Sequence, residues 1–315
     1  MNDETTYTQQ RSAQSTCGCA DSTQPTDPHP TANAAATVTQ RRLTGERAAF
    51  FAERTRYDGV TFADGESPLK HAHGVGLVDC SFQWKYPLWY ASDVTARRCT
   101  WFEMARAGVW YSRDITLEDC VVEAPKNFRR CTGLTLTDVS LPNAEETLWN
   151  CSDVKLSNVT ANGDYFGMNL ADAELDHFTL TGNYPFDGAR NLTIRDSRLL
   201  SKDAFWNAEN VTVTDSYIAG EYLGWNSRNL TFVNCTIESL QGLCYIDNLV
   251  MRGCRLLNTT LAFEYSTVDA ELNGSVDSVL NPASGRITAD GFGEVTLDPA
   301  RIDPAATLIC RRNRR

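Results

Sequence analysis

Asn191-Leu-Thr-Ile-Arg-Asp-Ser-Arg-Leu199 is followed after 19 residues by Asn210-Val-Thr-Val-Thr-Asp-Ser-Tyr-Ile218, and after 19 more by Asn229-Leu-Thr-Phe-Val-Asn-Cys-Thr-Ile237. Alternating apolar positions in such short stretches indicate strands with one buried face. The repeat extends in both directions, at intervals of 19 to 21 residues, through this column: Val60, Cys80, Cys99, Cys120, Val139, Val159, Phe178, Ser197, Ser216, Cys235 and Cys254. A fixed repeat of this length predicts one coil per repeat, which buries its apolar face only by stacking on its neighbours. The sequence therefore predicts a parallel β-solenoid.

We expect an all-β fold, a single-stranded parallel β-helix of about eleven coils over residues 43–304. Its hand is expected to be right-handed, because parallel crossover connections favour that hand and no six-residue subperiod is visible. Residues 1–42 are rich in Thr, Ser, Gln, Pro and Ala, and they contain almost no large aliphatic side chain. Such a segment cannot bury enough apolar surface to offset its ordering entropy. We therefore expect a disordered tail over residues 1–42 and a basic tail over residues 305–315.

Composition narrows the range of partners and the cellular location. The formal net charge of −11 argues against nucleic-acid binding, which requires a basic surface. The sequence shows no signal peptide and no apolar run long enough to span a membrane, so we expect a cytoplasmic protein without a membrane partner. Several of the eleven cysteines share the inward column, where cysteine acts as a small apolar group, and free buried thiols suit a reducing compartment.

The pattern resembles the right-handed β-helix of pectin-lyase-like proteins. More closely, it resembles an uncharacterised bacterial pectin-lyase-like family that is known only as a domain of unknown function. The resemblance covers roughly residues 43 to 300, and it implies a fold without implying a reaction. It rests on Ala63-Asp-Gly-Glu-Ser-Pro-Leu69, Lys85-Tyr-Pro-Leu-Trp-Tyr90, Glu103-Met-Ala-Arg106, Glu123-Ala-Pro-Lys-Asn-Phe-Arg-Arg130, Gly163-Asp-Tyr-Phe-Gly-Met168, Ser201-Lys-Asp-Ala-Phe-Trp206, Gly220-Glu-Tyr-Leu-Gly-Trp225 and Phe263-Glu-Tyr-Ser266.

Five of the seven tryptophans recur at the coil spacing, which predicts a second column. They are Trp89, Trp110, Trp149, Trp206 and Trp225. One interpretation is a structural ladder, in which like residues stack between coils. The other is an exposed platform on which sugar rings stack. Arg129, Met168 and Asp187 interrupt the column, and charges within it favour a ligand groove over a purely structural ladder.

A neighbouring stripe mixes carboxylates, cations and tyrosines on consecutive coils, which is what carbohydrate chemistry needs. Coils stack about 4.8 Å apart, so carboxylates one coil apart approach the retaining-glycosidase separation of about 5 to 5.5 Å. Carboxylates two coils apart lie near the upper end of the inverting range. The candidate catalytic residues are Glu145, Glu146, Asp164, Asp187 and Asp203, and Glu221 forms a one-coil pair with Asp203.

Basic residues near these carboxylates leave more than one function open. Arg106, Lys126 and Arg129, together with Tyr165 and the five tryptophans, are expected to bind the substrate. The first hypothesis is a carbohydrate-binding protein, with glycoside hydrolysis of short oligosaccharides as its reaction. The alternatives are a non-catalytic binding or assembly scaffold, and a uronate lyase with an Arg or Lys base. No cofactor motif is present and we expect no metal, while oligomerisation is compatible with the sequence.

Overall fold

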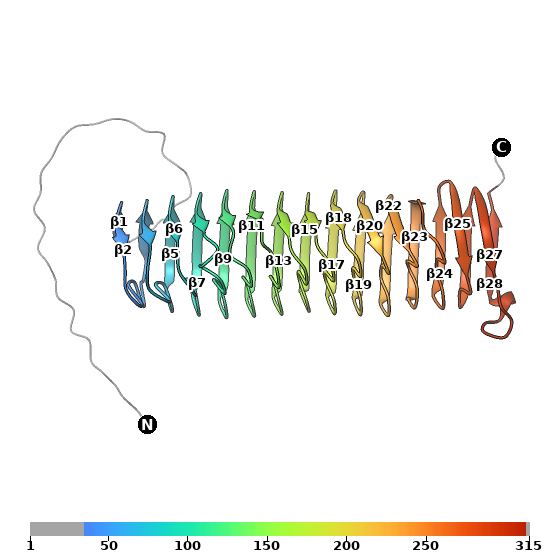
Figure 1. Ribbon diagram of the computed structural model, residues 1–315, viewed down its shortest axis with the longest axis horizontal. Helices are drawn as coiled ribbons and strands as arrows, with labels where there is room; N and C mark the ends of the chain where they lie inside the picture. The colour runs from blue at the N-terminus through green and yellow to red at the C-terminus, as the bar shows by residue number, and fades with distance from the viewer. Residues whose placement is uncertain (1–34, 313–315) are drawn as a thin grey trace, which may run out of the picture.

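The chain forms an elongated all-β parallel solenoid of about fifteen turns, which confirms the predicted fold class (Figure 1). This computed structural model describes residues 35–312. Within that range, the one helical element is the short 3-10 helix η1 (Pro304–Ala306). No helix in the described part is long and apolar enough to cross a membrane.

Each coil contributes one strand to a long first sheet, in which consecutive coils pair in parallel. The strands of the first sheet are β1 (Ala36–Thr39), β3 (Thr55–Asp58), β5 (His73–Val78), β7 (Ser92–Arg97), β9 (Arg113–Glu118), β11 (Thr132–Thr137), β13 (Ser152–Ser157), β15 (Ala171–Asp176), β17 (Arg190–Arg195), β19 (Glu209–Thr214), β21 (Arg228–Val233), β23 (Asp247–Leu256), β24 (Thr267–Leu272), β26 (Ser284–Ala289) and β28 (Thr307–Arg311).

A second parallel sheet contains shorter strands, each of which follows a tight corner after a strand of the first sheet. Its strands are β2 (Arg42–Leu43), β4 (Thr61–Phe62), β6 (Ser81–Phe82), β8 (Thr100–Trp101), β10 (Val121–Val122), β12 (Ser140–Leu141), β14 (Thr160–Asn162), β16 (Thr179–Thr181), β18 (Arg198–Leu200), β20 (Tyr217–Glu221) and β22 (Thr236–Leu240). The end of β23 pairs with β22, so this sheet continues to Leu256. Near the C-terminal end, β25 (Ser275–Leu280) pairs with β27 (Gly291–Thr296) in a separate two-stranded sheet.

The predicted number of about eleven coils is wrong, because the outer coils do not keep the regular period. In the first sheet Thr267 pairs with Ser284, a step of 17 residues, and Gly285 pairs with Thr307, a step of 22 residues. The register also shifts between β23 and β24. The column of Cys and aliphatic residues therefore stops at Cys254, although coils continue beyond it.

The solenoid also extends past both boundaries predicted for it. Strand β1 pairs with β3 and begins at Ala36, inside the segment expected to be a disordered tail. Strand β28 pairs with β26 inside the expected basic tail. Backbone pairing and the contacts of Val38 and Ile309 with the core stabilise these ends despite their polar composition. Residues 1–34 and 313–315, which make up the rest of the two expected tails, lie outside the described residues.

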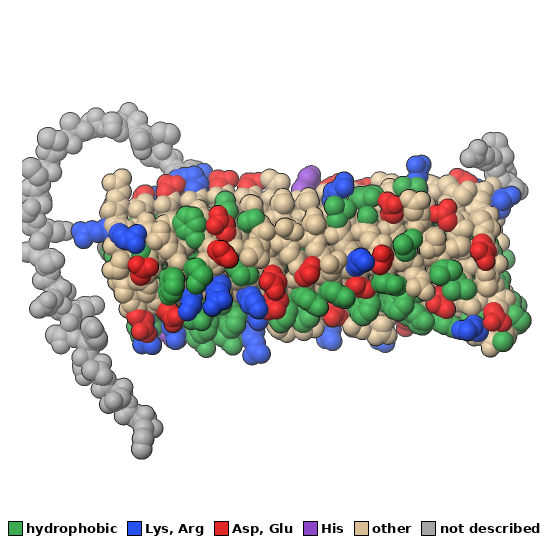
Figure 2. All heavy atoms as spheres, in the orientation of Figure 1, with side chains coloured by type: hydrophobic (Ala, Val, Ile, Leu, Met, Phe, Trp, Pro, Cys, Tyr) green, Lys and Arg blue, Asp and Glu red, His purple; other side chains and the backbone are tan. Residues whose placement is uncertain are grey.

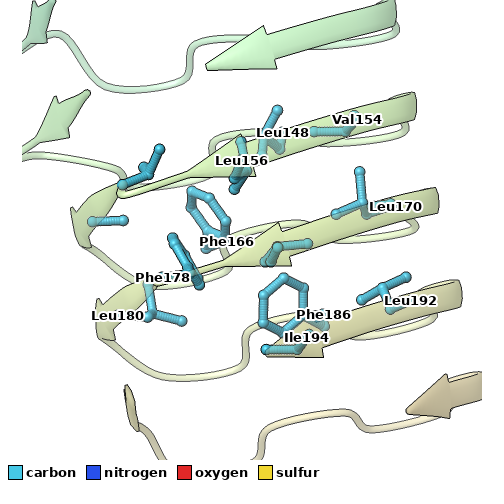
Figure 3. Packing of buried hydrophobic residues seen from close by; sticks show 14 of the residues in the cluster. Leu148, Val154, Leu156, Phe166, Leu170, Phe178, Leu180, Phe186, Leu192 and Ile194 are labelled. Carbon is cyan, nitrogen blue, oxygen red and sulfur yellow. The ribbon is translucent and has the colours of Figure 1, made fainter. Parts of the chain in front are cut away.

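The core is one continuous column of apolar side chains inside the coils. Phe166, Phe178 and Phe186 lie close together between neighbouring coils (Figure 3). Their ring centroids lie 5.3 Å apart for Phe166 and Phe178, and 5.9 Å apart for Phe166 and Phe186. Contacts of this kind between coils, rather than within one coil, stabilise a solenoid.

The cysteines in the core are free thiols. Cys80, Cys99 and Cys120 follow one another in the inward column, and all three are buried. The thiol of Cys80 donates to the carbonyl oxygens of Tyr57 and Val78, and its backbone N–H donates to the sulfur of Cys99. The polar part of each thiol therefore has a partner in the coil backbone. Cys17 and Cys19 lie outside the described residues.

Asn and Asp residues form the corners that enter the first sheet. Asn191, Asn210 and Asn229 have φ values of 54° to 57°, in the left-handed region that Asn tolerates better than most residues. Their side-chain amides also bond from coil to coil: Asn210 donates to Asn191 at 2.9 Å, and Asn229 donates to Asn210 at 2.9 Å. This ladder accounts for the recurrence of Asn in the sequence and keeps successive coils in register.

Candidate functional site

One face of the solenoid carries a band of hydrophobic, basic and acidic side chains along much of its length (Figure 2). The predicted tryptophan column is half-buried, and its rings stack on neighbours in adjacent coils. Trp89 and Trp110 lie 5.2 Å apart at an angle of 6°, and Trp206 and Trp225 lie 6.0 Å apart at 11°. Neighbouring rings therefore cover ring faces that a sugar would need for stacking.

The indole N–H groups of this column are also used within the fold. Trp89 donates to the carbonyl oxygen of Ala107, and Trp149 donates to that of Tyr165. Trp110, Trp206 and Trp225 make the equivalent bond to the next coil. These bonds link successive coils, so the column contributes to the cohesion of the solenoid whatever else it does.

Arg129, which interrupts the tryptophan column, continues its stack. The guanidinium carbon lies 5.1 Å from the ring centroid of Trp110 and 4.2 Å from that of Trp149. A planar cation between two aromatic faces is a favourable arrangement. The sequence argument that a charge in this column favours a ligand groove therefore loses its force at Arg129, because a packed ladder accommodates this charge.

Glu146 lies between two of the predicted basic residues. Its carboxylate accepts a hydrogen bond from Arg129 and forms an ion pair with Lys126 at 3.3 Å. Burial alone would raise the pKa of Glu146, but the hydrogen bonds and charges of Arg129 and Lys126 outweigh it and hold this pKa below its usual range. Glu146 is therefore suited to orient these cations and unsuited to act as a general acid.

The other predicted residues of this band occupy separate positions. Glu145, Asp164 and Arg106 are exposed, and the Asp164 carboxylate accepts from the backbone N–H of Asn183 at 2.7 Å. Asp187 accepts from the amide of Asn207 at 2.8 Å. Tyr165 is 38% exposed and stacks on Tyr184. Glu145 and Asp164 are brought to equivalent places on adjacent coils, whereas Asp187 lies in the tryptophan column.

Asp203 and Glu221, the second predicted pair of carboxylates, differ in their surroundings. Asp203 is 5% exposed, and its backbone N–H bonds to the carbonyl oxygen of Glu221 on the next coil. Burial, and next the charge of Glu221, raise the pKa of Asp203, while Lys202 and a hydrogen bond from Tyr184 act in the opposite direction. Glu221 forms an ion pair with Lys202 at 3.2 Å. Two neighbouring carboxyl groups with different proton affinities are typical of acid–base sites.

A hollow of about 500 Å³ lies beside this pair, on the outer face of the second sheet. We call it the leucine hollow, because Leu200 and Leu240, with Ala219, give it an apolar lining. Its charged and amide groups come from Lys202, Glu221, Glu238 and Asn258. Leu240 is 48% exposed, so this apolar surface is open to solvent.

The leucine hollow lies where the second sheet widens. The early strands β4 to β12 have two residues each, whereas β20 and β22 have five. Register places Leu200 beside Ala219 and Glu238, and Glu221 beside Leu240. A side chain at Gly220 would collide with the backbone of Ser201, so glycine allows this close approach between coils.

A second hollow of about 690 Å³ lies over the same strands, nearer the first sheet. We call it the corner hollow. Its lining includes Asn158, His177, Asp196, Arg198, Asp215 and Tyr217. The ligand atoms of Asp176, His177 and Asp196 all lie within 4.8 Å of one another, so in the described part of the chain these three side chains could hold a metal ion.

Sequence reasoning missed both hollows, although it included Asp203 and Glu221 in its stripe. The signal for the leucine hollow was present in Tyr217-Ile-Ala-Gly-Glu221 and Thr236-Ile-Glu-Ser-Leu240, where the strand pattern continues beyond the inward Ile. The corner hollow had no comparable signal, because its residues come from corners that look alike in every coil.

Over residues 36–310 the sequence matches the family described as "Protein of unknown function (DUF3737)", and the chain belongs to this family. The resemblance to a β-helix family of unknown function is confirmed in this form. No curated protein matches the sequence.

Several solved structures share the repetitive architecture at low identity. The pentapeptide repeat protein HetL of the cyanobacterium Nostoc is 12% identical, with 74% of this chain and 89% of that chain covered and a TM-score of 0.31. The surface adhesin PfbA of Streptococcus pneumoniae is 8% identical, with 89% and 84% covered and a TM-score of 0.38. The A-module of the mannuronan C-5 epimerase AlgE6 of Azotobacter vinelandii is 10% identical, with 88% and 91% covered and a TM-score of 0.36. At these values no function is transferred to the chain.

Proposed function

We propose that the protein binds a carbohydrate in the leucine hollow. The observation that carries this proposal is the composition of the hollow, in which Leu200, Ala219 and Leu240 meet Lys202, Glu221 and Glu238 in one place. Ligand sites commonly combine an apolar surface with a few polar groups that fix orientation, and the volume of this hollow falls within their usual range. A sugar ring presents both C–H faces and hydroxyl groups, so it matches such a surface.

The polar groups around the hollow are already oriented. The carboxylate of Glu238 accepts from the hydroxyl of Tyr217 at 3.0 Å and from the amide of Asn258 at 2.7 Å. These hydrogen bonds, that of Asn258 first, lower the pKa of Glu238 and keep it ionised as an acceptor near neutral pH. Lys202 supplies donors from the other side of the hollow. Both donors and acceptors are therefore available for hydroxyl groups.

A titration of short oligosaccharides, followed by calorimetry, tests this proposal. Leu240→Ala removes apolar surface from the hollow and should weaken binding roughly tenfold, a loss of about 1.4 kcal/mol. Leu308→Ala is the matched control, because Leu308 is an exposed leucine far away on β28. Loss of affinity in the first variant alone supports the proposal. Equal affinity in both variants, or no binding of any sugar in a broad panel, would refute it.

Glycoside hydrolysis is the second candidate function, and the contrast between Asp203 and Glu221 favours it. A carboxyl group with a raised pKa can donate a proton, while an ionised neighbour one coil away, at about 4.8 Å, approaches the separation in retaining enzymes. Asp203→Asn should then abolish the release of reducing ends and leave sugar binding intact. Release of unsaturated uronate instead would indicate lyase chemistry. Binding without any product would leave a non-catalytic module.

A further inference from the structure

The corner hollow and the leucine hollow adjoin each other on one face. Arg198 of β18 lines the corner hollow, and Leu200, two residues later, lines the leucine hollow. On β20, Tyr217 and Ala219 have the same relation. Residues two apart on a strand point to the same side and lie roughly 7 Å apart. The two hollows are therefore neighbours along the strand direction.

A row of connected side chains joins the two hollows. The guanidinium of Arg198 lies 5.0 Å from the ring centroid of Tyr217. The hydroxyl of Tyr217 donates to Glu238, which lines the leucine hollow. Among the described residues, no second aromatic ring stacks on Tyr217, in contrast to the tryptophan column. Tyr217 is thus an oriented ring at the junction of the two hollows.

The charges of this face restrict the class of ligand. Asp196 and Asp215 line the corner hollow, and Glu221 and Glu238 line the leucine hollow. Against these four carboxylates stand Arg198, which lies over Tyr217, and Lys202, which forms an ion pair with Glu221. Like charges brought together on a surface repel, so this excess of carboxylates disfavours a polyanion.

We infer that the two hollows form one extended site for an oligosaccharide without carboxylate groups, which crosses the strands of the second sheet at Tyr217. This inference rests on the proposed function of the leucine hollow and adds the length and charge class of the ligand. One end of the oligosaccharide occupies the leucine hollow, the middle passes Tyr217, and the other end occupies the corner hollow beside Asp196 and Asp215.

The test compares neutral gluco-oligosaccharides of one to six units with galacturonate oligomers of equal length, by calorimetry. Affinity for the neutral series should rise roughly tenfold or more with length before it levels off. The uronate series should bind at least roughly tenfold more weakly at equal length. Asp196→Asn combined with Asp215→Asn should reduce this discrimination, because the substitutions remove two carboxylates from the corner hollow.

Two further variants separate the inference from the proposed function. Thr179→Trp fills the corner hollow, and Tyr217→Phe keeps the ring but removes the bond to Glu238. Thr179→Trp should weaken only the longer oligomers, and it is interpreted only if its melting temperature matches the wild type. Tyr217→Phe should weaken longer oligomers at an unchanged fold. If short sugars bind but affinity is independent of length and of both variants, the extended site is refuted while the leucine hollow stands. If no sugar binds, the proposed function fails.

Discussion

Replacement of Trp149 by alanine distinguishes a tryptophan column that stabilises the coil stack from one that binds ligand. The indole loses the Arg129 guanidinium, which lies 4.2 Å from its ring centroid, for about 0.5–1 kcal/mol. It also loses the hydrogen bond of 2.6 Å to Tyr165, for about 0.5–1.5 kcal/mol. Burial of roughly half the ring adds about 1 kcal/mol. The expected cost to the free energy of unfolding is about 3 kcal/mol.

Trp84→Ala is the matched control, because Trp84 is also half-buried but lies outside the column. Its ring contacts the ammonium of Lys85 at 5.3 Å, and it makes no indole hydrogen bond among the described residues. We expect a cost of about 1.5 kcal/mol for this control. At roughly 2 °C per kcal/mol for a chain of this size, the melting temperatures should fall by about 6 °C and about 3 °C.

Differential scanning fluorimetry, checked by urea unfolding followed by circular dichroism, measures both shifts. The sugar titration is repeated on each variant at a temperature where both are folded. A structural column predicts the larger loss of stability for Trp149→Ala with unchanged sugar affinity. Equal stability losses in the two variants, accompanied by weaker sugar binding in Trp149→Ala alone, would overturn this argument and restore the platform interpretation.

Three other predictions concern the core and the carboxylates. Ile218→Asp places an unpaired charge among buried side chains and should prevent cooperative folding, whereas Leu240→Asp, at an exposed position, should leave the circular dichroism spectrum unchanged. The described cysteines should react with a thiol reagent in full only after unfolding without reductant, with Cys310 the first to react because it alone among them is partly exposed; native disulfides would contradict both this and the expected reducing location. Asp203 has a raised pKa in the folded state, so its ionisation costs stability as pH rises through that pKa, and Asp203→Asn should stabilise the protein at pH 7 but not in acid. Glu146 has a lowered pKa, so its contribution exists above its unfolded value and is lost as pH falls; Glu146→Gln should destabilise at pH 7 and become neutral in acid, in melting temperatures recorded from about pH 3 to 8.

The sequence by itself determined the inward side of the solenoid. Residues such as Cys80, Phe178 and Ile218 meet nearly the same surroundings in every coil, namely the equivalent residues one repeat before and after. That uniform environment selects small or apolar side chains at a fixed interval, so the period alone predicted strands, parallel stacking and free buried thiols. It failed at the ends, where coils of 17 and 22 residues break the interval.

The tertiary structure alone decided the outward side, because outward side chains choose among rotamers and partners on several coils. Arg129 looked like a charge that interrupts a ladder, but it lies between two indole rings and pairs with Glu146. Asp203 and Glu221 were placed on adjacent coils by the repeat, yet only their burial and ion pairing separate their proton affinities. The hollows depend on the widening of β20 and β22 and on contacts across coils, and no single period records contacts that differ from one coil to the next.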